Sequence, residues 1–240
     1  MVVKKLVIAL SSEHKISLLQ LIGDAMLQQQ THEPLHLVLT IAPQVVVSVI
    51  DDLPVARTII EFILEKESQL TYELKATEGL EQVLTKKLVR LSTHTDLLEK
   101  EVIVRLQGSH AKASIKVTCF GFDQKVFKFK TVQDHQAEHA KSNVIIKSVL
   151  EDQAKLFSHS LIHVHDKAHH SVADQVNKNI LLSSQARAVS IPTLEVLAHD
   201  VRCKHGAAIS KLDDEQIFYA QSRGIDAAKT KQMLIEAFLN

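Results

Sequence analysis

The sequence contains no tryptophan, and aromatic residues make up only 4% of its 240 residues. The core must therefore be filled mainly by valine, isoleucine and leucine, the apolar side chains that the chain has in abundance. Aliphatic side chains stack well inside a solenoid of short strands, although many α/β proteins have a similar composition. The shortage of aromatics also counts against a polysaccharide-binding groove, which usually presents stacking rings.

The chain also has no excess of charge of one sign, no long apolar run and few cysteines. Lysine plus arginine equals aspartate plus glutamate at 28 each, so no general attraction to nucleic acid or anionic membrane is expected. No apolar run approaches the roughly 20 residues that span a bilayer, and residues 1–10 are too short and mixed for a signal peptide. The two cysteines, Cys119 and Cys203, are expected to be free thiols in a reducing compartment. We therefore expect a cytoplasmic protein that binds neither nucleic acid nor membrane.

The sequence also lacks the common catalytic motifs. It has no phosphate-binding glycine loop, no nucleophile elbow, no paired CxxC motif and no HExxH motif. We therefore expect a chain that is not an enzyme and that binds no nucleotide.

Short β-branched runs separated by turn-like residues dominate the chain after Pro34. The runs lie at 35–41, 44–50, 57–64, 69–76, 86–92, 101–106, 114–120, 125–130 and 143–149. No helix of ordinary length is expected between residues 35 and 203, which argues against a doubly wound sheet. A sandwich, a barrel and a β-helix remain open, and a sandwich is the commonest of these. Because six glycines are few for so many turns, polar residues such as Asn179 and Asp200 are expected at the corners.

The two ends of the chain follow different patterns. Residues 2–9 predict a strand, and residues 13–29 predict an amphipathic helix because their apolar residues recur near the helical period. Near the other end, Asp213 and Asp226 are typical N-caps of two short helices, and Gly224 is expected to end the first. We therefore divide the chain into an N-terminal strand–helix segment (1–33), a β core (34–204) and a C-terminal helical segment (205–240).

The stretch 201–224, VRCKHGAAISKLDDEQIFYAQSRG, combines several unlike features. Cys203 and His205 point to the same side if residues 201–205 are extended, about 7 Å apart. A thiolate and an imidazole are both ligands for iron, so the pair is a candidate metal or cluster site. The alternative is a half-buried cysteine that packs beside a histidine making one hydrogen bond.

Four ordered blocks in this region resemble the SufB/SufD family of iron–sulfur cluster assembly scaffolds, SufD more closely than SufB. They are PTLEV at 192–196, DVRCKHGA at 200–207, LDDEQIFY at 212–219 and SRGI at 222–225. The resemblance extends over about residues 33–240, through QVNKNILLSS at 175–184 and the glycine turn LQGSHA at 106–111. Family members carry a larger N-terminal helical region than the roughly 30 residues found here.

The resemblance implies a right-handed parallel β-helix followed by C-terminal helices, and a scaffold that is not itself an enzyme. It implies two kinds of partner: a SufB-like chain or an identical chain, and a SufC-like ABC ATPase. It also implies that Cys203 and His205 lie at or near a transient iron–sulfur cluster, to which the partner chain adds a cysteine. The C-terminal helices are implied to bind the ATPase, through Asp213, Asp214, Glu215, Phe218, Tyr219 and Arg223.

The histidine-rich run SHSLIHVHDKAHH, at 158–170, is a further candidate metal site. Metal sites need convergent third and fourth ligands, which the run does not reveal. A solvated ladder of polar side chains on the outside of a β-helix is the favoured interpretation of these histidines: His159, His163, His165, His169 and His170.

Two other functions remain open. A shortened relative could keep the partner surfaces and lack cluster chemistry. A β-helix enzyme acting on carbohydrate would need carboxylates that converge on a groove. The low aromatic content makes this second alternative the weaker one.

Overall fold

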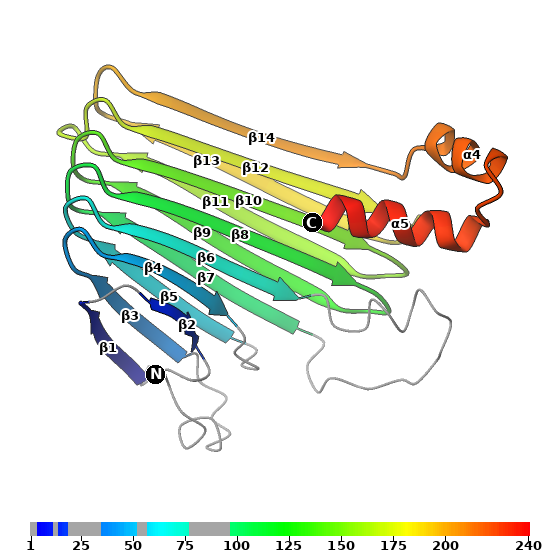
Figure 1. Ribbon diagram of the computed structural model, residues 1–240, viewed down its shortest axis with the longest axis horizontal. Coiled ribbons are helices and arrows are strands. Elements are labelled where there is room, and N and C mark those ends of the chain that lie inside the picture. Colours follow the sequence, from blue (N-terminus) through cyan, green and yellow to red (C-terminus); the bar gives the residue numbers. More distant parts are fainter. Residues whose placement is uncertain (1–3, 12–13, 19–34, 52–56, 77–96) are drawn as a thin grey trace.

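A computed structural model of the chain describes residues 4–11, 14–18, 35–51, 57–76 and 97–240. The described chain is mostly β-strand as far as residue 210, and two helices follow (Figure 1). The mostly β fold with C-terminal helices that the sequence predicts is confirmed.

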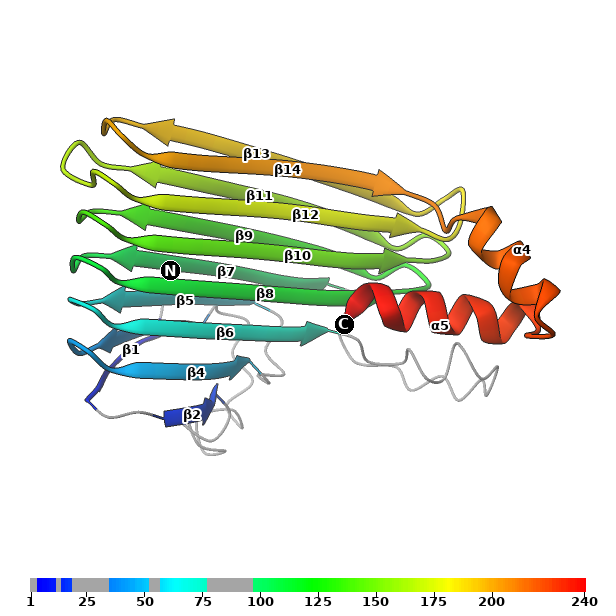
Figure 2. The ribbon, with the colours of Figure 1, turned by 45° about the horizontal axis from the view of Figure 1, so that its top comes forward.

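The described strands form two parallel sheets of seven strands each. Sheet A contains, in spatial order, β1 Lys4–Leu10, β3 Leu35–Ile41, β5 Arg57–Leu64, β7 Leu97–Leu106, β9 Val126–His135, β11 Lys155–Val164 and β13 Arg187–Val196. Sheet B contains β2 His14–Ser17, β4 Val46–Asp51, β6 Gln69–Ala76, β8 Lys112–Gly121, β10 Lys141–Leu150, β12 Val172–Leu181 and β14 Arg202–Ser210. Consecutive strands alternate between the sheets, so each turn of the chain adds one strand to each sheet (Figure 2). This coil is a parallel β-helix, not a sandwich of antiparallel sheets.

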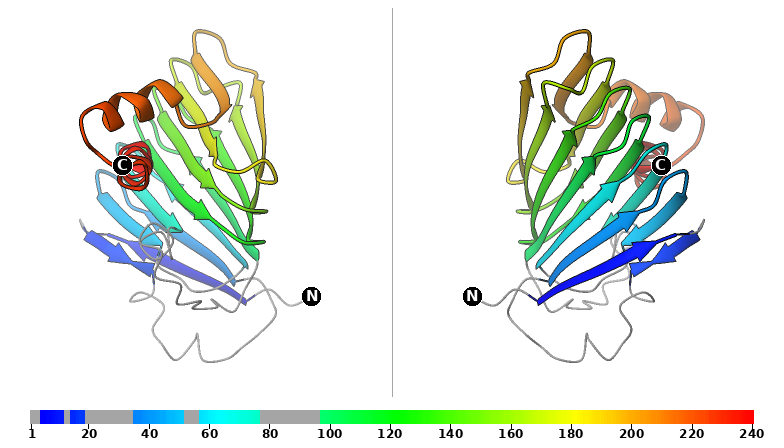
Figure 3. Two further views of the ribbon diagram at one scale, coloured as in Figure 1. Left: turned by 90° about the vertical axis from the view of Figure 1, so that its right-hand side faces the viewer. Right: turned by 90° about the vertical axis from the view of Figure 1, so that its left-hand side faces the viewer.

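The core lies between the two sheets, which stand as opposite walls when viewed along the strands (Figure 3). In β5, RTIIEFIL, every second side chain is buried: Thr58, Ile60, Phe62 and Leu64. Apolar residues at a spacing of two therefore form half-buried strands here, as the period of the pleat requires.

Residues other than glycine make the corners that join the two strands of each rung. Gln44, Glu67, His110, His139, His170 and Asp200 all have a φ between 55° and 63°. Consecutive members lie on neighbouring rungs, since the amide of His139 donates to the carbonyl of His169 and that of His170 to Asp200. The corner role expected for Asp200 is confirmed. The corner role expected for Asn179 is wrong, because Asn179 is buried within strand β12.

Gly108 is the exception, because its turn needs the absence of a side chain. A Cβ on Gly108 would lie 1.9 Å from the backbone nitrogen of Lys66, well inside any permitted contact. The glycine-containing turn expected at 106–111 therefore brings two rungs into close contact.

The N-terminal residues differ from their prediction. The helix expected over 13–29 is wrong for His14–Ser17, which form β2 and pair with β4. The remainder of that helix and the strand expected at 86–92 lie outside the described residues. The division at residues 33 and 204 stays a prediction, but neither edge matches the end of a sheet. β1 pairs with β3 across the first edge, and β14 continues past the second to Ser210.

The two helices are α4 Asp214–Ser222 and α5 Ala227–Leu239, and their predicted N-caps, Asp213 and Asp226, are confirmed. α5 lies along sheet B beside β10, and α4 extends beyond the end of β14 (Figures 1 and 2). Ile235 and Leu239 of α5 pack against Val149 of β10 and its neighbours. Neither described helix is long and apolar enough to cross a membrane.

Candidate functional site

The last rung of the coil, formed by β13 and β14, holds the pair of residues singled out from the sequence. Cys203 and His205 pair in register with Ala173 and Gln175 of β12, and both of these β12 residues are buried. Neighbouring strands in register present side chains to the same face, so Cys203 and His205 point to the inner side of the coil. The prediction that they share one face of a strand is confirmed.

Cys203 is a half-buried thiol in an apolar setting. It packs against the cluster that contains Ile162, Val164 and Ala173. Burial raises the pKa of the Cys203 thiol, and a hydrogen bond with the backbone of Ala173 opposes the rise. The thiol is therefore mostly protonated at neutral pH, and a bound metal would have to displace its proton.

His205 is exposed, and no described residue makes a hydrogen bond or ion pair with its imidazole. Residues two apart on a strand are about 7 Å apart, so Cys203 and His205 can flank a small group without touching each other. An iron–sulfur cluster usually takes four protein ligands. The pair can therefore supply part of such a ligand set.

Buried polar side chains fill the middle of the rungs next to this pair. Gln175 and Asn177 of β12 are fully buried beneath β14. The amide of Asn177 donates to Ser158 Oγ at 3.2 Å. Further along, Ser142 Oγ lies 2.5 Å from Gln133 Oε1 and 2.7 Å from His135 Nε2. The coil therefore has a polar interior that leads from β9 to the open last rung.

This polar interior was not identified from the sequence. Its signal is the alternation in β12, where Gln175, Asn177 and Asn179 occupy successive inward positions. The alternation has the period of a strand, but its inward residues are polar, so a search for apolar periodicity does not find it.

The last rung also ends both sheets. β13 and β14 each pair with a described strand on one side only, so their other edges carry unpaired backbone groups. Pro192 lies in β13, and proline is tolerated in a strand at the edge of a sheet. Large apolar side chains are exposed on and beside these strands: Val189, Ile191, Leu194, Val196, Leu197 and Ile209.

The predicted ATPase surface lies on α4, which has no buried residue. Phe218 and Tyr219 are 72% and 62% exposed, and the Arg223 guanidinium lies 5.3 Å from the centre of the Tyr219 ring. Asp213 accepts a hydrogen bond from the Glu215 amide and so caps the helix. Capping explains the acidic residues, but core packing does not explain Phe218.

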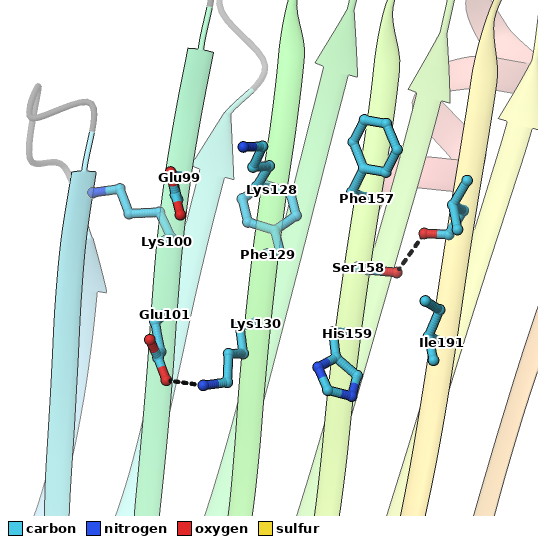
Figure 4. Close-up of a pocket in the computed structure, with 11 residues that line it drawn as sticks. Glu99, Lys100, Glu101, Lys128, Phe129, Lys130, Phe157, Ser158, His159 and Ile191 are labelled. Atoms are coloured by element: carbon cyan, nitrogen blue, oxygen red, sulfur yellow. Dashed lines mark hydrogen bonds and ion pairs between the residues drawn. The ribbon is translucent and has the colours of Figure 1, made fainter.

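A shallow groove crosses the outer face of sheet A over β7, β9, β11 and β13 (Figure 4). One part is apolar, with Phe157 and Ile191. The other part carries Glu101, which forms an ion pair with Lys130 at 2.7 Å. The groove's second carboxylate belongs to Glu99, and its Oε2 lies 3.3 Å from Arg57 Nε. Carboxylates held by cations in this way are poorly arranged for the acid–base chemistry of a carbohydrate-active enzyme.

The structure divides the histidine-rich run among three places. His159 lies on the outer face of sheet A beside Thr193. His169 and His170 are at a corner, where His170 stacks on His139 with ring centres 4.8 Å apart. His163 and His165 instead converge on one carboxylate, that of Asp134.

Asp134 is another residue of the candidate sites that sequence reasoning did not identify. It lies in β9 directly beside His163 of β11, from which it is separated by 29 residues of chain. Burial alone would raise its pKa, but hydrogen bonds from Gln136 and His165 and the histidine charges outweigh this and lower the pKa of Asp134. The carboxyl group is therefore ionised at neutral pH.

Comparison with known proteins gives the chain its family. Residues 48–238 match the family described as "SUF system FeS cluster assembly, SufBD core domain". The chain belongs to the SufBD family. The matched region contains the strands from β5 to β14 and almost the whole of both helices, so it includes the last rung and α4.

Individual relatives agree with this assignment. The iron–sulfur cluster assembly protein SufD of Escherichia coli (strain K12) is 31% identical over 142 residues, which is 59% of this chain and 34% of that protein. A SufBD family protein of Mycobacterium leprae is 27% identical over 205 residues, 75% of this chain and 51% of the relative. One from Synechocystis is 35% identical over 100 residues, 42% of this chain and 22% of the relative. The chain thus spans from about a fifth to about half of the length of these SufBD relatives.

Proposed function

We propose that this SufBD-family chain is a scaffold subunit of a SUF-type iron–sulfur cluster assembly complex, without catalytic activity or bound nucleotide of its own. It pairs with a SufB-like or identical chain and binds a SufC-like ATPase. The cytoplasmic location expected from the sequence is part of this proposal. The observation that carries it is the open last rung, where unpaired strand edges, exposed apolar side chains and the Cys203–His205 pair occur together.

Pairing through the last rung follows from the properties of exposed edge strands. A second chain can add strands to β13 and β14 and cover their apolar side chains in the same step. Such a partner would also face Cys203 and His205, and could supply the ligands that this pair lacks. Pairing and cluster binding would then share one surface.

The pairing surface is tested with two valines of equal exposure. Val189 of β13 and Val46 of β4 are each 41% exposed, but Val46 lies far from the last rung. Val189→Lys, combined with Ile209→Lys, is expected to abolish pairing in size-exclusion chromatography and in co-purification with the partner. Val46→Lys should leave pairing intact. Equal pairing by the double variant and the wild type would contradict this part of the proposal.

ATPase binding is tested on α4. Phe218→Ala and Tyr219→Ala are each expected to weaken capture of the cognate ATPase in a pull-down, because exposed aromatic side chains are typical anchors of interfaces. Phe157→Ala is the matched control, since Phe157 is also an exposed aromatic but lies on sheet A. Unchanged capture by both α4 variants would remove the docking claim.

The cluster site is tested by anaerobic reconstitution of the assembled pair with iron and sulfide. Cys203→Ser combined with His205→Ala is expected to lower the bound iron. Cys119 remains in this variant as an internal control, because it is fully buried and cannot reach the open end. Equal iron in the variant and the wild type would instead support the shortened relative that keeps its partners and lacks cluster chemistry.

A further inference from the structure

Three donor atoms converge on the outer face of sheet A, away from the last rung. Asp134 Oδ1 lies 3.1 Å from His163 Nδ1 and 2.8 Å from His165 Nε2. All three atoms lie within 4.8 Å of one another. Ligands about 2.1 Å from a common ion are about 3.0–3.4 Å apart, so a small rotation of the two rings would complete that geometry.

The strand register makes the convergence. Asp134 of β9 and His163 of β11 are direct neighbours, and His165 follows two residues later, on the same side of the chain. Each imidazole directs a ring nitrogen at the same carboxylate oxygen, although a single histidine would satisfy it. The other oxygen, Asp134 Oδ2, accepts hydrogen bonds from Arg105 Nη1 at 2.9 Å and Gln136 Nε2 at 2.7 Å. These contacts fix the carboxylate so that Oδ1 faces the histidines.

The local charge favours a cation. Arg105 is shared between Asp134 and Glu61, so this one guanidinium faces two carboxylates. Glu195 of β13 is in register with His163 and adds a third carboxylate on the same face. Because neighbouring strands are about 4.8 Å apart, the Glu195 side chain can reach an ion held by His163. The two histidine side chains are 26% and 38% exposed, so an ion can enter from solvent.

We propose that Asp134, His163 and His165 bind one divalent first-row transition-metal ion, of the class of Fe²⁺ or Zn²⁺. Two imidazoles and one carboxylate on one side of the ion leave open positions for Glu195 or water. Arg105 and Gln136 are positioning residues that hold the carboxylate. The site is separate from Cys203 and His205, which lie in sheet B and face the inside of the coil. This metal-site proposal does not depend on whether the chain assembles iron–sulfur clusters.

The experiment uses the full chain, stripped of metal with a chelator and titrated with Co²⁺ under anaerobic conditions. We expect one tight ion per chain, with a visible spectrum that shows nitrogen and oxygen ligands. A thiolate-to-cobalt charge-transfer band in the wild type would assign the ion to Cys203 and overturn the proposal. This readout needs no variant and so does not depend on how a substitution affects folding.

Variants then locate the ion. His163→Gln combined with His165→Gln should weaken Co²⁺ binding by at least about tenfold. Loss of a residue that only supports a ligand already lowers metal affinity by about that factor, and loss of a ligand should lower it at least as much. His139→Gln combined with His170→Gln removes two corner histidines and should leave binding unchanged. The Cys203→Ser and His205→Ala double variant should also bind as the wild type does. Equal affinity after loss of His163 and His165, or loss of the ion in either control, would refute the site.

Discussion

The two halves of the β-helix enclose different interiors within one backbone coil. In the N-terminal rungs the inward residues are almost entirely apolar, as in β3 and β5 with Leu37, Leu39, Ile60 and Phe62. In the C-terminal rungs, serine, glutamine, asparagine and histidine occupy many inward positions: Gln133, His135, Ser142, Ser148, Ser158, Ser160, Gln175, Asn177 and Asn179. Apolar residues fill others, such as Val144 and Ile146 in the middle of β10.

This difference between the two interiors shows that the ladder of backbone hydrogen bonds defines the coil, and that the chemical type of the inward-facing side chains does not. Each inner rung satisfies its backbone groups through hydrogen bonds to the rungs on either side, whatever its side chains are. The apolar half stabilises the fold through burial. The polar half contributes less by burial and lies next to the open rung, where we propose that a partner and a ligand bind. Four comparisons between variants test this division of roles.

The largest effect is expected in a buried charged network of the apolar half. Lys100 Nζ lies 3.2 Å from both oxygens of Asp51, whose carboxylate also accepts a hydrogen bond from the Tyr72 hydroxyl, and all three side chains are buried. Lys100→Met removes the cation that faces this buried carboxylate and should lower the free energy of unfolding by about 3–5 kcal/mol. Urea denaturation measures it. Lys128→Met, on the exposed face of β9, is the control and should change stability little.

The second prediction compares an apolar with a polar inward-facing side chain directly. Leu39 and Ser160 are both fully buried. Leu39→Ala removes apolar contacts and leaves a cavity, so it should lower the free energy of unfolding by about 3 kcal/mol. Ser160→Ala removes a hydroxyl that has no hydrogen-bond partner among the described residues, and should cost less than about 1 kcal/mol. Equal losses in thermal or urea denaturation would show that both halves stabilise alike.

The buried Cys119 thiol of β8 should make the free energy of unfolding depend on pH. Burial raises the pKa of Cys119 far above its usual range. Above about pH 8.5 the unfolded chain loses this proton while the folded chain keeps it, so stability should fall by about 1.4 kcal/mol per pH unit. Cys119→Ala should show a shallower decline between pH 9 and 10 in chemical denaturation. Parallel curves for variant and wild type would mean that the thiol ionises inside the fold.

The smallest effect is expected in the polar half. Both amide atoms of Gln175 are buried without a hydrogen bond to any described residue. Gln175→Leu should therefore stay within about 1 kcal/mol of the wild type, on the stabilising side. Asn179 is the control, because its amide bonds Ser148, Ser190 and the carbonyl of Ala208. Asn179→Leu should lose about 1–3 kcal/mol, and an equal loss from Gln175→Leu would contradict the comparison.

The sequence predicts the apolar half well, for a physical reason. The runs 35–41, 57–64 and 69–76 coincide with β3, β5 and β6, because their alternating apolar residues match the burial of the strands. β11 and β12 were not among the predicted runs, since their inward positions hold Ser158, Ser160, Gln175 and Asn177. A polar residue that faces inward removes the periodicity that the prediction relies on.

The candidate sites divide in the same way. Cys203 and His205 are two residues apart on one strand, so their shared face can be read from the sequence. The resemblance of the surrounding sequence blocks to the SufBD family, which the comparisons confirm, can be recognised from the sequence as well. Asp134 and His163 are neighbours only through the register of β9 and β11. The interval of about 30 residues between the corners at His139, His170 and Asp200 is the one signal that could have placed them side by side.

The unfinished edge of the coil affects how a cell can handle the free chain. A long strand with unpaired amides beside exposed isoleucine and valine is a template for any other extended chain. β13 is partly protected, because Pro192 interrupts its row of donors, whereas β14 contains no proline. Free chains would therefore adhere to other extended chains through β14 first, so that covering this edge, more than intrinsic stability, would keep the protein from aggregating.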